Sequence, residues 1–495
     1  MAIPKVLGME TEYGIVLRGG GESNPVSASS MLINAYVSSL ARKVNWDFED
    51  EMPGNDARGF RAAGSSPPDI ETHLVNAVLT NGARYYVDHA HPECSTPECS
   101  NAREVVVWDR AAERILQKSM EAVAPLLPDG QEIVVYKNNS DGKGNSYGCH
   151  ENYLMDRTIP FGRVVAGILP FFVTRQLFTG AGKVGSEAPG MSYREVPFQL
   201  SQRADFFEEE VGLETTLKRP IVNTRDEPHS DVQKYRRLHV IIGDANLSEV
   251  ATYLKVGTTA IVLSMIEDDE LAIDLSLAAS VPALRKVSYD LTLREPLALA
   301  DGSTATALEI QWQFLTMAKK WSDSHGFETV GGDIGADVLV RWEAVLTALE
   351  ADPDSLKDQV DWIAKRSLLE GYRDRHGLDW NDARLAAMDL QYHDLRPGKS
   401  LAARLGFERI TTDDEVEEAT VHPPRTTRAW FRGTCLDRWP TSIVSANWDS
   451  LVFDLGTDPL RRVPMMEPLR GTAALLEGLV DSCKSPAELI ERLSA

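Results

Sequence analysis

The chain has 495 residues, of which 43% are apolar and 25% are charged, and its net charge is −23 at pH 7. This length is typical of two or more domains or of one large enzyme fold, and the composition excludes collagen-like and disordered proteins. A surface this acidic argues against binding to nucleic acids and to anionic membranes, because both carry charge of the same sign.

The first predicted element is a strand over residues 3–15, where polar and apolar residues alternate. Glu10 and Glu12 share one face with Gly8 and Gly14, and the other face is apolar. Two neighbouring carboxylates on a sheet repel each other unless a cation lies between them, although such a pair can also lie in water at a sheet edge. We favour a ligand site, because the glycines allow close approach and carboxylate oxygens suit Mg²⁺ or Mn²⁺.

The next stretch is predicted to fold as a helix, a loop and a second helix. Helical periodicity extends over residues 28–44 and again over residues 71–80. Between them, residues 45–70 are rich in glycine, proline and mixed charges, which predicts a long, irregular and mobile loop. Long loops of this kind in compact enzymes are often functional.

The strand predicted over residues 83–88 concentrates its polar groups on one face. Arg84, Tyr86 and Asp88 are two residues apart, so their side chains point to the same side. Burying an arginine and an aspartate on one face of a strand costs desolvation free energy, so this row indicates a functional surface. The turn that follows adds His89, His91 and Glu93.

Other predicted strands carry similar rows. His150 and Asn152 follow a Gly-rich turn over residues 138–148, and Arg237 and His239 are two residues apart at the start of another strand. Any single histidine is more often structural, but several such strands together predict a concave sheet lined with polar groups. That surface suits a nucleoside triphosphate with bridging metal ions.

The rest of the chain is predicted to contain more helix than strand. In chain order we expect a helix over 102–125, strands over 132–138, 220–224 and 238–243, a helix over 247–267, and mainly helices over 305–395. Strands separated unevenly by long helical insertions favour an α+β fold with a mainly antiparallel sheet. We place a domain boundary near residue 416, which gives a catalytic domain over 1–415 and a small C-terminal domain over 416–495.

Three features bear on cofactor and location. The GAGKVG string at residues 180–185 fits the dinucleotide-binding pattern, but it follows an apolar helix instead of a strand. The most apolar run, residues 164–173, is too short to cross a bilayer, and the N-terminus lacks a signal-peptide pattern. Five cysteines, an odd number, fit a reducing compartment. We therefore expect a soluble, cytoplasmic protein with no membrane partner.

Several long strings resemble one enzyme family. GMETEYG resembles the opening strand of the Pup ligase/deamidase family. This family is a branch of the glutamine synthetase-like carboxylate–amine ligases, and its members act on the prokaryotic ubiquitin-like protein Pup. YVDHAHPECSTPE resembles a second segment of that family, and the likeness continues to ANWDSLVFDLG near the C-terminus. The resemblance implies a glutamine synthetase-like, curved and mainly antiparallel sheet that forms a cradle backed by helices, with a small C-terminal domain.

The family has two main branches. One ligates Pup to lysines, whereas the other deamidates the C-terminal glutamine of Pup and removes Pup from conjugates. WDFEDEMPGNDARGF in the long loop, VDHAHPE and YGCHENYL resemble the second branch. The resemblance therefore implies an ATP-dependent amidohydrolase that uses ATP and Mg²⁺, with Pup and pupylated proteins as its partners.

The resemblance also implies roles for single residues. Asp88 matches the catalytic aspartate, which can act as a nucleophile on the carbonyl or as a general base on water. Glu12 is a further possible ligand, and Glu98 and Arg225 are polar lining without an assigned role. The positions on the metal side are Glu10, Tyr86, Glu93, His150 and His239. The positions that match nucleotide contacts are Arg84, Thr96, Asn152, Arg237 and Trp448.

Three alternatives remain for the function. They are a Pup–protein ligase of the same family, a small-molecule ligase of the glutamine synthetase class, and a non-catalytic homologue that binds Pup or nucleotide. The presence of Asp88, Glu10 and Glu93 argues against the last, because an inactive homologue need not keep them.

Overall fold

One large sheet organises the protein. The computed structural model describes residues 1–20, 24–40, 43–49, 51–59, 61 and 75–494. In sheet order the ten strands are β13 (Tyr235–Val240), β8 (Cys149–Asp156), β1 (Leu7–Glu12), β6 (His91–Ser95), β5 (Arg84–Asp88), β4 (Asn76–Val78), β3 (Val44–Trp46), β16 (Ile443–Ala446), β17 (Ser450–Phe453) and β18 (Arg461–Pro464). β3 and β16 pair in parallel, and the other neighbours are antiparallel. The predicted α+β fold with a curved, mainly antiparallel sheet is confirmed.

Two long helices back the central strands. α2 (Ala102–Val123) packs against β1, and α5 (Glu249–Asp268) packs against β8. Both begin at polar caps, because the side chain of Asn101 accepts from the Glu104 N–H and that of Ser248 accepts from the Ala251 N–H. α5 is the one described helix that is long and apolar enough to cross a membrane, but all of its apolar window is buried inside the protein.

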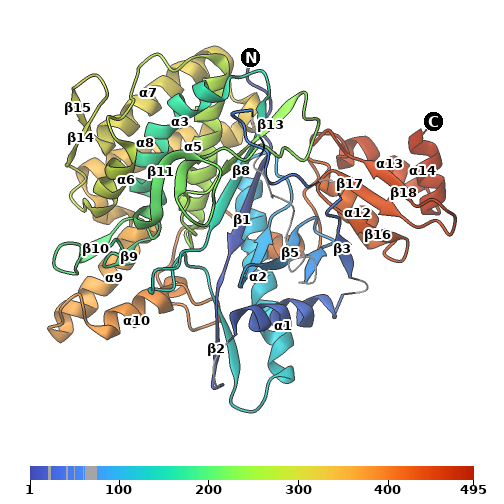
Figure 1. The fold of residues 1–495 in the computed structure, drawn as a ribbon, viewed down its shortest axis with the longest axis horizontal. Coiled ribbons are helices and arrows are strands. Elements are labelled where there is room, and N and C mark those ends of the chain that lie inside the picture. Colours follow the sequence, from blue (N-terminus) through green and yellow to red (C-terminus); the bar gives the residue numbers. More distant parts are fainter. Residues whose placement is uncertain (21–23, 41–42, 50, 60, 62–74, 495) are drawn as a thin grey trace.

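Most of the other helices form a thick layer on the same side of the molecule as α5, and a smaller group lies at the opposite end of the sheet (Figure 1). The layer contains α3 (Phe161–Thr174), α6 (Ser280–Tyr289), α7 (Ala307–His325), α8 (Asp333–Ala351), α9 (Asp361–His376) and α10 (Ala383–Tyr392). The smaller group contains α12 (Ala429–Arg438), α13 (Ala473–Ser482) and α14 (Pro486–Ser494). The helical prediction for residues 305–395 is confirmed, as are the helices predicted over 102–125 and 247–267.

Two predicted elements near the N-terminus are divided in the structure. The strand expected over residues 3–15 is β1 followed by β2 (Gly14–Arg18), which leaves the large sheet and pairs with β7 (Glu132–Tyr136). The helix expected over 28–44 is α1 (Pro25–Val37), and Val44 already belongs to β3. Pro25 supplies an early start because proline suits the first helical turn, with Asn24 as the cap.

The helix predicted over residues 71–80 is wrong where the structure describes it. Residues 76–78 form β4, which pairs with β5 across a tight turn, and residues 71–74 lie outside the described part. Gly82 in that turn has φ +81°, a conformation that favours glycine. The Asn81–Gly82 pair is a strong hairpin signal, whereas a short apolar run cannot by itself distinguish strand from helix.

The C-terminal strands extend the same sheet. β16 lies beside β3, with Ser445 opposite Asn45 and Ala446 opposite Trp46. Residues separated by about four hundred positions in the chain are therefore neighbours, and the red elements of Figure 1 continue the sheet past its N-terminal strands. The division into 1–415 and 416–495 stays a prediction.

A buried ion pair links β8 to the helical layer. Glu151 is fully buried and accepts hydrogen bonds from both terminal nitrogens of Arg175, at 2.8 and 2.6 Å. The Tyr153 hydroxyl donates to the same carboxylate at 2.6 Å. Removing one partner of such a pair leaves a buried charge without compensation.

We expect Glu151→Ala to lower the free energy of unfolding by about 3–5 kcal/mol, because Arg175 loses its carboxylate. Urea unfolding followed by tryptophan fluorescence measures this change. The control is Glu343→Ala, which removes a pair with Lys319 in which both side chains are 45% exposed, and its effect is expected to stay below about 1 kcal/mol. Equal effects of the two variants would contradict the prediction.

Candidate active site

Five neighbouring strands direct polar side chains to one face of the sheet. Glu10 on β1 lies opposite His150 on β8 and Ser95 on β6, and Glu12 lies opposite Glu93 on β6. Because successive residues of a strand point to opposite faces, the intervening residues turn towards α2 and α5. The predicted rows on β5 and β13 extend the same polar face.

One cluster on this face joins Glu10, His150 and His239. A ligand atom from each lies within 4.8 Å of the others. His239 Nε2 is buried and has no hydrogen-bond partner among the described residues, while its Nδ1 lies 3.2 Å from Asn152 Oδ1. A histidine that is oriented through one nitrogen and leaves the other unpartnered fits a metal ligand.

The charge of Glu10 is stabilised by this cluster. Burial alone would raise the pKa of Glu10, but the nearby His150, whose Nδ1 lies 3.7 Å from Glu10 Oε2, and the charge of Arg237 lower it well below the usual range. Burial and the Arg237 charge lower the pKa of His239 well below its ordinary value. His239 is therefore neutral, which is the form that binds a metal ion.

A second cluster contains only carboxylates, from Glu12, Asp88 and Glu93, whose oxygens also lie within 4.8 Å of one another. Burial raises the pKa of Glu93 well above its ordinary value, and the charges of Asp88 and Glu12 raise it further. Burial also opposes ionisation of Glu12, yet contacts with His91 and His150 and the Gly148 N–H hold its pKa at about 2. Oxygen donors alone suit Mg²⁺.

Asp88 lies at the more open side of this cluster. Its side chain is 30% exposed, whereas that of Glu12 is 11% exposed. His89 Nδ1 lies 2.9 Å from Asp88 Oδ2, and His89 has φ +50°, so the turn after β5 holds a histidine against the carboxylate. His91 lies beside the cluster, with its Nδ1 3.7 Å from Glu12 Oε2.

Tyr86 and Arg84 lie together beside the carboxylates. The Tyr86 hydroxyl is 3.3 Å from Ser95 Oγ, and burial together with the charge of Glu93 raises its pKa well above the ordinary value. The Arg84 guanidinium lies 4.1 Å from the Tyr86 ring and 4.0 Å from the Trp46 ring. Arg84 also donates to Asn76 at 2.9 Å.

A cleft of about 560 Å³, including its open mouth, adjoins the Glu10 cluster. Thr96, Asn152, Arg237 and Trp448 line it, so four of the five predicted nucleotide contacts lie together, and Arg84 lies outside its lining. The lining residues for which the sequence indicated no role include Glu98, Pro228, His229, Arg428 and Pro468. Arg428 and Pro468 come from the C-terminal part of the chain, whose position depends on the pairing of β16 with β3.

Residues 45–46 of the loop predicted over 45–70 belong to β3, and residues 56–57 lie along the end of β12 (Arg219–Asn223). The Ala57 N–H donates to the Thr224 carbonyl at 2.8 Å, and Thr224 Oγ1 donates to Asp56 at 2.7 Å. Glu51 lies 3.8 Å from Arg84. Residues 50, 60 and 62–70 of this loop lie outside the described part, and its mobility stays a prediction.

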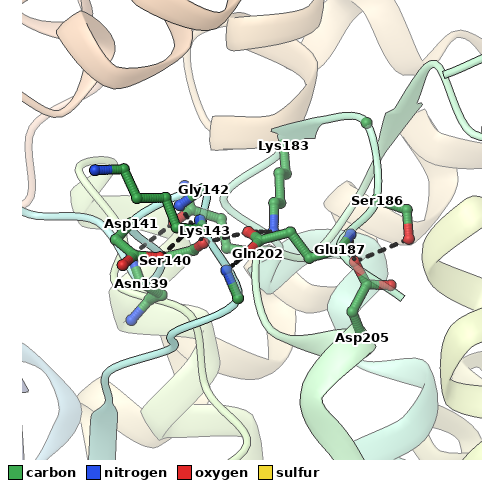
Figure 2. A network of polar contacts seen from close by, with 12 residues as sticks. Asn139, Ser140, Asp141, Gly142, Lys143, Lys183, Ser186, Glu187, Gln202 and Asp205 are labelled. Atoms are coloured by element: carbon green, nitrogen blue, oxygen red, sulfur yellow. Dashed lines mark hydrogen bonds and ion pairs between the residues drawn. The ribbon is translucent and has the colours of Figure 1, made fainter. Parts of the chain in front are cut away.

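The Gly-rich turn before β8 is held from outside the large sheet. The Gly144 N–H donates to Glu187 at 2.7 Å, and Ser140 and Lys183 also bind Glu187 (Figure 2). The Glu187 N–H in turn donates to Asp205 at 2.8 Å. This network fixes the turn over residues 138–148, whose last residue lies against the candidate metal ligands.

Gly148 is that last residue, and it touches both clusters. Its N–H donates to Glu12 Oε1 at 2.8 Å. A Cβ at this position would overlap His150 Nε2, and it would lie 2.7 Å from His150 Cδ2 and 2.9 Å from Glu12 Oε1. The sequence signal was a glycine placed directly before a polar strand, which marks close approach of the backbone to other groups.

Comparison with known proteins identifies relatives over the whole chain. The family described as Pup-ligase protein matches residues 5–452. A depupylase of Acidothermus cellulolyticus is 53% identical over 99% of both chains, and a Pup deamidase/depupylase of Mycolicibacterium smegmatis is 48% identical over 99% of both. A Pup–protein ligase of Kineococcus radiotolerans is 42% identical over 82% of this chain and 90% of the ligase.

Two solved structures of the ligase PafA share the fold. The complex of Pup with PafA has a TM-score of 0.80 and 31% identity, covering 99% of this chain and 94% of that one. PafA in complex with ADP has a TM-score of 0.74 and 35% identity, covering 82% and 89% of the two chains.

We expect Gly148→Ala to weaken Mn²⁺ binding by about tenfold or more, because the new methyl group displaces His150 and Glu12. Calorimetric titration with Mn²⁺ measures the affinity. The matched control is Gly162→Ala in α3, where the added Cβ would meet no described atom within 4 Å. Unchanged Mn²⁺ affinity in Gly148→Ala would show that the turn does not set the ligand positions.

Metal binding is expected to depend on pH through Glu93. Its raised pKa keeps a proton on the carboxyl, so a cation must displace that proton, and affinity rises by up to about tenfold per pH unit until the pH passes the pKa of Glu93. Calorimetry of Mn²⁺ binding in buffers of different ionisation enthalpy measures the released proton. Glu93→Gln should lose this dependence while Glu343→Gln keeps it, and a pH-independent wild type would contradict the prediction.

Proposed function

Because the chain belongs to the Pup ligase family, we infer that it hydrolyses the amide bonds that involve the C-terminus of Pup. It removes the amide of a C-terminal glutamine as ammonia, and it cleaves the isopeptide bond between Pup and a substrate lysine. The observation that carries this conclusion is the similarity to depupylases at 47–53% identity over 99% of the chain, against about 41–42% over 82% for the ligases.

We propose Asp88 as the catalytic residue. As a nucleophile, its oxygen attacks the amide carbonyl, the C–N bond breaks, and the amine leaves as ammonia or lysine after taking up a proton. Water then opens the resulting anhydride and restores the Asp88 carboxylate. As a general base, Asp88 instead takes a proton from water, the hydroxide adds to the carbonyl, and the departing amine carries the proton away. The greater exposure of Asp88 within its cluster supports either role.

We propose that ATP or ADP binds in the cleft, since the relative PafA was solved with ADP. Thr96, Asn152, Arg237 and Trp448 line that cleft and are the proposed contacts. Arg84 does not line the cleft, and its guanidinium lies over the Tyr86 ring. We propose that it contacts the phosphates from that position.

The metal proposal rests on the two clusters. Glu12, Asp88 and Glu93 supply the oxygen donors that Mg²⁺ prefers, and Tyr86 lies beside them as a neutral phenol. Glu10, His150 and His239 form a second set, in which imidazoles also suit softer divalent ions. A bound ion would neutralise these carboxylates and withdraw electrons from a phosphate or carbonyl oxygen.

The partners and location follow from the same function. Pup and pupylated proteins are the proposed macromolecular substrates, and PafA is a relative solved in complex with Pup. We propose that the protein acts in the cytoplasm, with a catalytic unit over 1–415 and a C-terminal unit over 416–495. All five cysteines are buried free thiols, which fits that compartment.

With ATP, Mg²⁺ and Pup ending in glutamine, the protein should release ammonia, and Asp88→Asn should lower this rate by about 10³-fold or more while still binding ADP. An enzymatic ammonia assay and a fluorescent ADP titration measure the two properties. The control is Asp354→Asn, at an exposed carboxylate that pairs with Lys357.

Two outcomes would contradict the proposal. Conjugates formed with Pup ending in glutamate, together with no ammonia release, would assign the chain to the ligase branch. Substantial turnover by Asp88→Asn would remove Asp88 from its catalytic role. Incorporation of oxygen-18 from water into Asp88 during a single turnover distinguishes the nucleophile from the general base.

A further inference from the structure

Two parts of the chain form opposite walls of the nucleotide cleft. Strands β1, β6, β8 and β13 supply one wall, with Thr96, Asn152 and Arg237 among its residues. The other wall includes Arg428 and Trp448 from the C-terminal segment, which we define here as residues 427–468. The shape of the cleft therefore depends on how that segment docks against the sheet.

Glu98 makes the central contact between the two walls. It lies three residues after the end of β6, lines the cleft, and accepts a hydrogen bond from Arg428 Nε at 2.7 Å. Both terminal nitrogens of Arg432 donate to the same carboxylate, one of them at 3.1 Å. The two arginine side chains are 3% and 0% exposed, so one carboxylate balances two buried cations.

The Arg432 side chain in turn fixes Trp448. Its Nη1 donates to the Trp448 carbonyl at 3.0 Å, and its guanidinium lies 5.1 Å from the Trp448 ring. The Trp46 ring packs edge-on against Trp448, at 5.2 Å between ring centroids. Trp448 is thus held between a guanidinium that depends on Glu98 and an aromatic ring from β3.

We propose that Glu98 is a positioning residue for nucleotide binding: through Arg432 it places Trp448, and it couples docking of the C-terminal segment to occupation of the cleft. This inference rests on the proposed nucleotide site. Glu98 needs no contact with the nucleotide itself for this role.

The coupling follows from the position of the cleft. A ligand that contacts both walls binds the docked arrangement better than an undocked one, so it stabilises docking by linkage. By the same reciprocity, a change that weakens docking must also lower the affinity for the ligand. Burial alone would raise the pKa of Glu98, but Arg432 and Arg428 hold it at about 2, so the contact keeps its charge at neutral pH.

The test is Glu98→Gln, which keeps the shape of the side chain and removes its charge. We expect the Kd for a fluorescent ADP to rise about tenfold, because Arg432 loses the negative charge and one of the two acceptor oxygens that orient it. The nucleotide concentration that gives half-maximal ammonia release is expected to rise by a similar factor. Limited proteolysis should cut the variant faster within residues 427–468, and added ADP should suppress that cleavage.

The matched control is Glu477→Gln, which removes an exposed pair with Arg425 near the same segment. Its ADP affinity and proteolysis pattern should equal those of wild type. Arg432→Lys supplies a second route if Glu98→Gln folds poorly, since it keeps a cation but cannot make the planar two-nitrogen contact with both oxygens of Glu98. Arg432→Lys should lower the affinity for ADP in the same way.

The outcomes separate this inference from the proposed function. Folded Glu98→Gln or Arg432→Lys with wild-type ADP affinity would overturn the positioning role, and so would cleavage that ADP leaves unchanged. A wild-type protein that binds no ADP would overturn both this inference and the proposed nucleotide site. ADP coupling without any ammonia release would support the role of Glu98 and contradict the proposed reaction.

Discussion

The structure depends on the antiparallel placement of β1 between β6 and β8. This register sets Glu10 opposite His150 and Glu12 opposite Glu93, and it sends the alternate residues into the helical layer. A slip of one residue would exchange the two faces, burying carboxylates against α2 and α5. The polar cradle and the apolar core are therefore two consequences of one pairing.

The same pairing creates an electrostatic conflict that a bound cation would resolve. Glu12 and Glu93 face each other, yet the pKa of Glu12 is lowered to about 2 while that of Glu93 is raised well above its ordinary value. The difference arises because Glu12 accepts a hydrogen bond from the Gly148 N–H and lies beside two histidines, whereas the charged neighbours of Glu93 are mainly other carboxylates. Such a site stays partly protonated until positive charge arrives.

The sequence could predict what short-range periodicity controls. The two faces of β1, the row on β5 and the long helices were predictable because burial imposes a period on the residues themselves. The helix predicted over 71–80 failed because a three-residue strand carries too little pattern, and its Asn81–Gly82 turn was the stronger signal. The β3–β16 pairing and the contact of Glu98 with Arg432 join distant segments, and no local pattern encodes them.

Strand β6 connects the parts of the site in a definite order. Asp88 lies opposite His91 at its start, Glu93 follows, and Thr96 and Glu98 lie beyond its end at the nucleotide cleft. At about 3.3 Å per residue, the five steps from His91 to Thr96 span roughly 16 Å. The catalytic candidate and the cleft therefore lie at opposite ends of one rigid element, with the carboxylate cluster between them. A shift in either wall of the cleft would therefore move any ligand held there relative to Asp88, at the far end of the strand.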